Sequence, residues 1–119
     1  MASSSQFSVF EYLYRDAGNW KAWGQLLLEG APNDNEISLL CERLESGEFF
    51  IAEQLGIPPL FQKSRAQYGE PTQDDHSWHE FAGIRPATEM EIVHGPIWGT
   101  IQALIKRANS ITAWEPFPR

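Results

Sequence analysis

Cysteine is nearly absent from this sequence, which contains a single residue of this type, Cys41. One cysteine cannot form an internal disulfide, and it cannot supply a cysteine-rich zinc site. Cys41 lies on a stripe with Ile37, Leu40 and Leu44, at the i, i+3, i+4, i+7 spacing of a buried helix face. We therefore expect Cys41 to be a core thiol and not a nucleophile.

Basic residues are also scarce: nine Lys and Arg stand against sixteen Asp and Glu, for a net charge of −7. A general nucleic-acid binder needs cations to neutralise phosphates, so we expect no direct nucleic-acid binding. An acidic surface either keeps a small protein soluble or meets a basic protein partner.

Long apolar runs are missing, so no stretch is predicted to span a membrane. The first ten residues, MASSSQFSVF, lack the basic and apolar regions of a signal peptide, so a cytoplasmic location is expected.

What is present is enough apolar surface for one core: 119 residues, of which 42% are hydrophobic. The patterns predict an α+β domain at 7–110, with a disordered N-terminus at 1–6 and an extended tail at 111–119. Within the domain we expect a mainly antiparallel four-stranded sheet in ββαββα order, with both helices on one face. The predicted elements are strands at 7–16, 20–30, 48–55 and 76–85, and helices at 33–47 and from Pro96 to Ala108. Residues 87–94 fit either an extended segment or a fifth strand.

The stretch DDHSWHEF at 74–81 concentrates the titratable side chains of the chain. On a strand, alternation places His76, Trp78 and Glu80 on one face and His79 on the other. His76 and Glu80 would also lie roughly 13 Å apart at ~3.3 Å per residue, too far for a shared metal ion. We therefore predict no local metal site and no cofactor, although Asp74, Asp75 and His76 could complete a site with distant residues.

Two other interpretations of this stretch remain open. In the first, a histidine beside Glu53 on a neighbouring strand performs acid–base chemistry. In the second, the acids shape the turn, the aromatic residues pack, and a histidine bonds to the backbone.

The stretch YLYRDAGNW at 12–20 carries a second polar group at a predicted hairpin turn. Arg15 can grip a carboxylate or phosphate at two points, and Asp16 and Asn19 suit the turn itself. If the fold brings this turn beside the 74–81 stretch, Arg15 would share a site with Asp75 and His76.

Together the two stretches resemble a group of small bacterial proteins that share a YxYRDxxN hairpin and a DDHxWHEF segment. The resemblance covers roughly residues 10–85. It implies a bacterial or phage origin and one α+β domain, and it implies no activity for any residue.

The leading hypothesis for function is a small interaction protein that engages a basic protein partner, in an immunity- or antitoxin-like role. Its candidate binding residues are Arg15, Asp16, Asn19, Asp74, Asp75, His76, His79 and Glu80. The alternative is a small hydrolase or nuclease-like enzyme that uses Asp75, His76, His79 or Glu80 with a divalent metal. The sequence has no phosphate-binding glycine loop, nucleophile elbow or HExxH motif. A third hypothesis is a homodimer that forms through an exposed strand edge.

Overall fold

The sheet is built around the hairpin of β1 (Phe7–Arg15) and β2 (Lys21–Glu29), which pair antiparallel from Phe7 with Glu29 to Arg15 with Lys21. The computed structural model describes residues 6–15, 21–60 and 78–114. Strand β1 is central because both of its faces are apolar. Phe10, Tyr12 and Tyr14 are buried on one face, and Val9 and Leu13 on the other.

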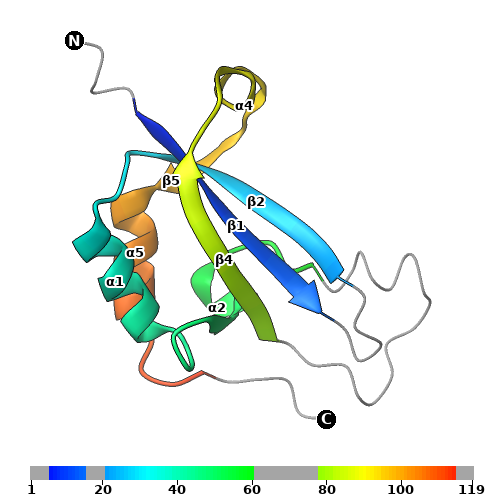
Figure 1. Cartoon of the computed structure of the whole chain (residues 1–119). Coiled ribbons are helices and arrows are strands. Elements are labelled where there is room, and N and C mark those ends of the chain that lie inside the picture. Colours follow the sequence, from blue (N-terminus) through cyan, green and yellow to red (C-terminus); the bar gives the residue numbers. More distant parts are fainter. Residues whose placement is uncertain (1–5, 16–20, 61–77, 115–119) are drawn as a thin grey trace.

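Three further strands complete a five-stranded, mixed and strongly curled sheet in the order β3-β4-β1-β2-β5. Strands β4, β1 and β2 lie side by side in Figure 1. Strand β4 (Trp78–Pro86) runs antiparallel to β1 with a bulge between Glu11 and Tyr12, and β3 (Phe49–Ile51) runs antiparallel to β4. Strand β5 (Ile97–Thr100) pairs parallel with β2. The prediction of four strands was therefore wrong.

Helix α1 (Asp34–Arg43) begins where the sequence predicted and ends early. Asn33 caps it, and the Glu36 side chain accepts from the Asn33 N–H in return, which makes a capping box. The predicted end at Gly47 was wrong, because Leu44 is already extended. Gly47 instead adopts a φ of +79° in the turn that leads to β3.

The predicted strand at 48–55 divides into β3 and the short helix α2 (Ala52–Leu55). Ala52 and Leu55 lie three residues apart and are both 0% exposed, so burying them together requires a helical turn. Gly56 ends this turn in the left-handed conformation, with a φ of 74°.

Residues 87–94 form neither an extended segment nor a fifth strand. They contain the helix α4 (Glu89–His94), which starts at a capping box between Thr88 and Glu91. The last helix, α5 (Ile101–Asn109), starts five residues after Pro96. Thr100 caps it by accepting from the Ala103 N–H at 3.0 Å. Threonine caps therefore set the starts of α4 and α5, and the prediction that a helix begins at Pro96 was wrong.

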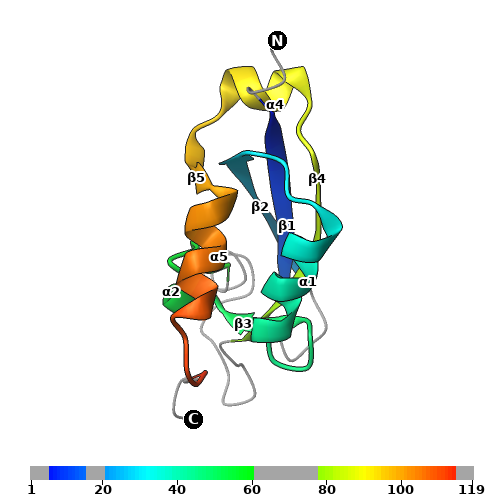
Figure 2. The same cartoon turned by 90° about the vertical axis from the view of Figure 1, so that its left-hand side faces the viewer.

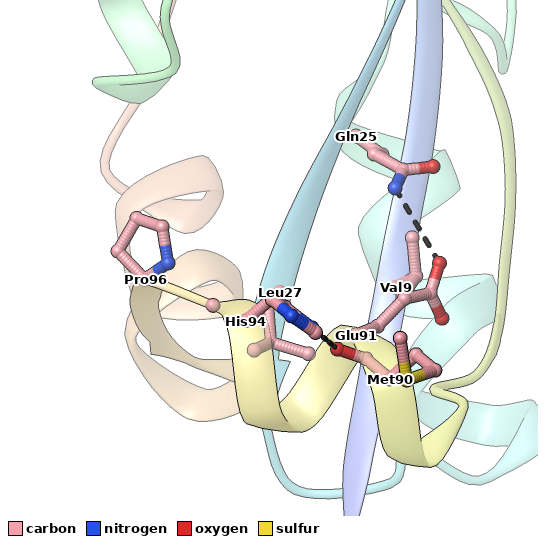
Figure 3. Close-up of a pocket in the computed structure, with 8 residues that line it drawn as sticks. Val9, Gln25, Leu27, Met90, Glu91, His94 and Pro96 are labelled. Carbon is pink, nitrogen blue, oxygen red and sulfur yellow. Dashed lines mark hydrogen bonds between the residues drawn. The ribbon is translucent and has the colours of Figure 1, made fainter.

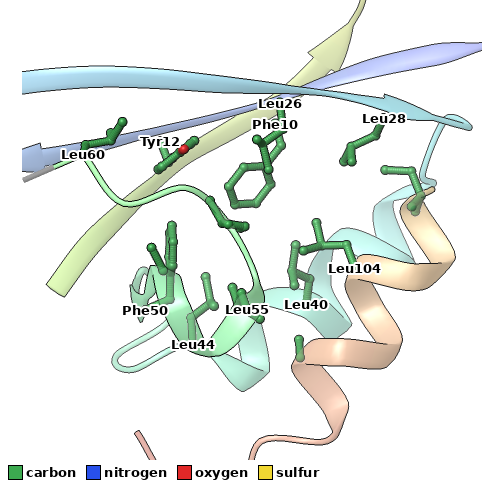
Figure 4. Close-up of a cluster of buried hydrophobic side chains, with 14 of the residues drawn as sticks. Phe10, Tyr12, Leu26, Leu28, Leu40, Leu44, Phe50, Leu55, Leu60 and Leu104 are labelled. Carbon is green, nitrogen blue, oxygen red and sulfur yellow. The ribbon is translucent and has the colours of Figure 1, made fainter. Parts of the chain in front are cut away.

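Helices α1 and α5 cover one face of the sheet, and α4 lies at the end of the sheet where β1 begins (Figure 2). The core lies between the sheet and the helices and joins aromatic residues of β1 to aliphatic residues of the helices (Figure 4). The core includes Phe10, Tyr12, Leu28, Leu40, Phe50, Leu55 and Leu104.

The start of the predicted C-terminal tail is fixed to the domain. The Trp114 indole N–H donates to the Arg43 carbonyl at 3.1 Å, and its ring lies edge-on to Trp78. No helix in the described part of the chain has the length and apolar character needed to cross a membrane. The predicted disorder of 1–6 falls almost wholly outside the described residues, but the Gln6 carbonyl accepts from Gly30 at 2.8 Å.

Candidate functional site

Arg15 and Glu80, two of the predicted binding residues, meet across β1 and β4. Arg15 Nε donates to Glu80 Oε2 at 3.1 Å, and Arg15 Nη2 donates to Glu80 Oε1 at 3.3 Å. The hydrogen bonds and charge of Glu80 raise the pKa of Arg15 above its usual value. Because both groups are partly exposed, solvent screens this two-point ion pair, and it adds little to stability.

His79 faces away from Glu80, as alternation on a strand predicted, and its side chain is 0% exposed. The rings of Tyr12, Tyr14 and Phe50 surround it, with centroids 6.1, 5.2 and 5.9 Å from the imidazole. This position in the aromatic core is typical of a structural histidine.

The His79 ring also fixes the backbone of the segment that follows α2. Its Nε2 accepts from the Leu60 N–H at 2.9 Å, so this nitrogen carries no proton in the folded state. On the neighbouring strand, the Tyr12 hydroxyl donates to the Pro58 carbonyl at 2.7 Å. Burial raises the pKa of Tyr12 to about 12, because the phenolate would lose its hydration there.

Two side chains from β5 and α5 bind the backbone of the last turn of α2 and of the residue that ends it. Arg107 of α5 donates from Nε to the Gln54 carbonyl at 3.0 Å, and Trp98 of β5 donates from its indole to the Gly56 carbonyl at 3.1 Å. Side chains from four different elements therefore bind the backbone at every second residue of 54–60. The two prolines of this segment lack backbone N–H groups, so the segment cannot pair fully as a strand. The side-chain hydrogen bonds satisfy its backbone groups instead.

Five of the predicted site residues, Asp16, Asn19, Asp74, Asp75 and His76, lie outside the described residues, so their predicted site with Arg15 stays a prediction. The acid–base interpretation places Glu53 on a strand beside His76 or His79, and its His76 form cannot be compared because His76 lies outside the described residues. Glu53 is instead exposed on α2, whereas His79 is fully buried.

A pocket of about 330 Å³ opens between α4 and the sheet, at a place that no sequence motif indicated. Val9 and Leu27 provide its apolar floor, and Met90, Glu91 and His94 of α4 provide its rim (Figure 3). The Thr88–Glu91 spacing of a capping box was the signal that could have revealed this helix.

Arg85 attaches α4 to the sheet through carboxylates on two elements. It donates from Nη1 and Nη2 to the two oxygens of Glu91 at 2.9 and 2.7 Å, and from Nε to Glu11 at 3.0 Å. The bonds from Arg85, together with one from the Thr88 N–H, lower the pKa of Glu91 to about 2. Glu91 and Glu11 in turn raise the pKa of Arg85. This pocket wall therefore stays charged across the physiological pH range.

Large apolar side chains beside the pocket face solvent. Met90 is 66% exposed, Val93 76% and Ile97 49%, and no residue of α4 is buried. Such a patch is unusual for a surface that meets only water, and it is typical of a binding surface.

Cys41 is half-buried, not fully buried as expected, and burial raises the pKa of its thiol. This keeps the thiol protonated and unreactive at neutral pH. Among the residues that the structure describes, no three His, Cys, Asp or Glu side chains gather as metal ligands would.

Comparison with known proteins assigns no relative, since no family model, curated protein or solved structure matches the chain.

Proposed function

We propose that this chain is a small acidic interaction protein that binds a basic protein partner, in an immunity- or antitoxin-like role. One surface property carries the proposal: exposed carboxylates that outnumber cations occur together with exposed apolar side chains. Protein-binding surfaces combine these features, because apolar contacts supply affinity and charge selects the partner.

The carboxylates are concentrated on α1 and the turn that follows it. Asp34, Glu42, Glu45 and Glu48 are exposed along this stretch, and Arg43 is its only cation. Arg43 donates to Asn109 at 3.0 Å, and in the sheet Arg85 and Arg15 are bound by carboxylates of the chain itself. The carboxylates of this stretch therefore face solvent in excess over its one cation, and they attract a basic partner over about one Debye length, ~8 Å at physiological salt.

The enzyme alternative draws less support from the two of its residues that the structure describes. His79 Nε2 already accepts from Leu60 inside the core, and both Glu80 oxygens accept from Arg15. A general base needs access to substrate, and a buried ring whose acceptor nitrogen is occupied has little. Asp75 and His76, the other two residues, lie outside the described residues.

The dimer alternative depends on a strand edge that can pair with a second copy. Both edge strands are short, with three residues in β3 and four in β5. A second copy could therefore pair with β3 or β5 through only a few backbone groups, and a longer pairing would have to use the part of β2 or β4 that lies beyond them.

Affinity capture from the native host tests the proposal. The tagged full-length chain should retain a basic protein at physiological salt and release it at high salt, as identified by mass spectrometry. A variant with Glu42, Glu45 and Glu48 all changed to Gln tests the contribution of negative charge. It should retain less of that protein than the wild type does. The proposal is wrong if no partner is retained, or if the purified chain holds a metal and loses a hydrolytic activity on His76→Ala or His79→Ala.

A further inference from the structure

Helix α4 is held in place by polar contacts and not by burial. Arg85 grips Glu91 at both carboxylate oxygens, the Gln25 amide adds a bond at 3.4 Å, and the Thr88–Glu91 capping box fixes the first turn. A helix of six residues is too short to form alone, so these contacts and the sheet determine its position. Its apolar residues are therefore free to contact another molecule.

The exposed residues form one surface with the pocket. We define the α4–β5 surface as Met90, Val93, His94 and Ile97 together with the pocket floor of Val9 and Leu27. His94 is turned toward the helix, because its Nδ1 donates to the Met90 carbonyl at 2.9 Å (Figure 3). The floor is apolar, and Glu89, which is exposed beside Met90, forms no ion pair with a described residue, so one apolar side chain and one cation can be accommodated side by side.

Charge around this surface selects the occupant. The carboxylates of Glu11, Glu29, Glu89 and Glu91 lie on α4 or on the neighbouring strands β1 and β2, and Arg85 is the one cation among the described residues there. The strand cations Arg15 and Lys21 lie opposite each other at the far end of the hairpin.

A second copy of this chain would bring the same carboxylates together, because a twofold interface joins identical patches. A basic partner would instead place Lys or Arg beside Glu89, which forms no ion pair with a described residue. Charge complementarity therefore favours a basic partner over self-association.

We propose that the α4–β5 surface is the docking site for a basic segment of another protein, with an apolar side chain in the pocket and a cation at Glu89. This inference rests on the proposed function and adds the place of binding and the chemistry of the bound segment.

Titration with designed peptides, followed by methyl NMR and calorimetry on the full-length chain, tests this docking site. The probe is a cationic amphipathic helix with Leu at i, i+3, i+4 and i+7 and Lys elsewhere. One control peptide has the same composition in scrambled order, and another has Glu in place of Lys. Only the probe should bind, with salt-dependent affinity, and it should shift the methyl signals of Met90, Val93 and Ile97.

Variants then locate the surface. The double variant Met90→Gln, Val93→Gln should weaken binding by about tenfold or more, as expected when two interface anchors are removed. The matched control is Leu39→Gln, which replaces the apolar residue of α1 that is 45% exposed and should leave affinity unchanged. Glu89→Gln should weaken binding and reduce its salt dependence.

Each contrary result has its own meaning. Shifts confined to α1, with affinity lost in Leu39→Gln, would overturn this docking site and leave the proposed function standing. No binding of the probe, or equal binding of all three peptides, would also overturn it, while host capture tests the proposed function separately. A wild-type dimer in sedimentation that Met90→Gln, Val93→Gln converts to monomer would identify a second copy as the occupant and overturn the inference.

Discussion

The ring of Tyr12 lies over Gly24, its partner across the β1–β2 pair. A Cβ atom at position 24 would meet Tyr12 Cζ at 2.9 Å and Leu60 Cδ2 at 2.9 Å. The missing side chain of Gly24 thus lets the Tyr12 hydroxyl reach the Pro58 carbonyl, and the aromatic ring covers the weak point that glycine leaves in a strand.

Gly24→Ala should destabilise the fold by about 1–3 kcal/mol, since the added methyl group overpacks the site. Urea denaturation measures the change. Gly99→Ala is the matched control, because a Cβ at that position on β5 would meet nothing within 4 Å. Equal stability for the two variants would show that Tyr12 does not depend on the space above Gly24.

His79→Phe should cost about 1–3 kcal/mol, because it keeps a ring in the core but leaves the buried Leu60 N–H without its acceptor. His79→Gln should cost less, since its side-chain oxygen can accept from the same N–H. Hydrogen exchange at Leu60 should accelerate in the Phe variant. A Phe variant as stable as the wild type, with Leu60 still protected, would contradict the structural role of His79.

Glu91→Gln should make stability depend less on pH at the acid end. The folded-state pKa of Glu91 is about 2 and its ordinary value is 4.5, so the ionised carboxylate favours the folded state. This contribution is complete above about pH 4.5 and is lost as the pH falls toward 2.

The difference in unfolding free energy between wild type and Glu91→Gln should therefore be largest near neutral pH and shrink below pH 4.5. Denaturation at a series of pH values measures it. Glu89→Gln is the control on the same helix, since Glu89 forms no ion pair with a described residue. A difference for Glu91→Gln that stays constant down to pH 2 would argue against the Arg85–Glu91 pair.

Tyr12→Phe should remove part of the alkaline sensitivity of the fold. Burial raises the pKa of Tyr12 from 10.0 to about 12, so the folded state favours the neutral phenol. This advantage is complete below about pH 10 and is lost as the pH rises through 12.

Near neutral pH, Tyr12→Phe should be less stable by about 1 kcal/mol, because the Pro58 carbonyl loses its donor. The difference in stability between wild type and Tyr12→Phe should narrow between pH 10 and 12, as followed by circular dichroism. A difference that is independent of pH would show that Tyr12 ionises as readily in the fold as outside it.

The sequence by itself determined the features that follow from local pattern and composition. The two apolar faces of 7–15 placed β1 at the centre of the sheet, and Asn33 and Glu36 marked the start of α1. Alternation along a strand is enough to separate His79 from Glu80, because neighbouring side chains point to opposite faces. The net charge of −7 and the single cysteine are composition alone, and the predicted classes of partner and site rest on them.

Only the tertiary structure decided the features for which local signals compete. Ala52 to Leu55 continues the apolar run of 49–51 that predicted a strand, yet burial of Ala52 and Leu55 in one core makes it a helix. Pro96 suits a helix start, but parallel pairing of β5 with β2 keeps 97–100 extended. The α4–β5 surface depends on Arg85, which joins Glu91, six residues further along the chain, to Glu11 on β1. The contact with Glu11 spans distant segments, and such contacts leave no periodic trace in the sequence.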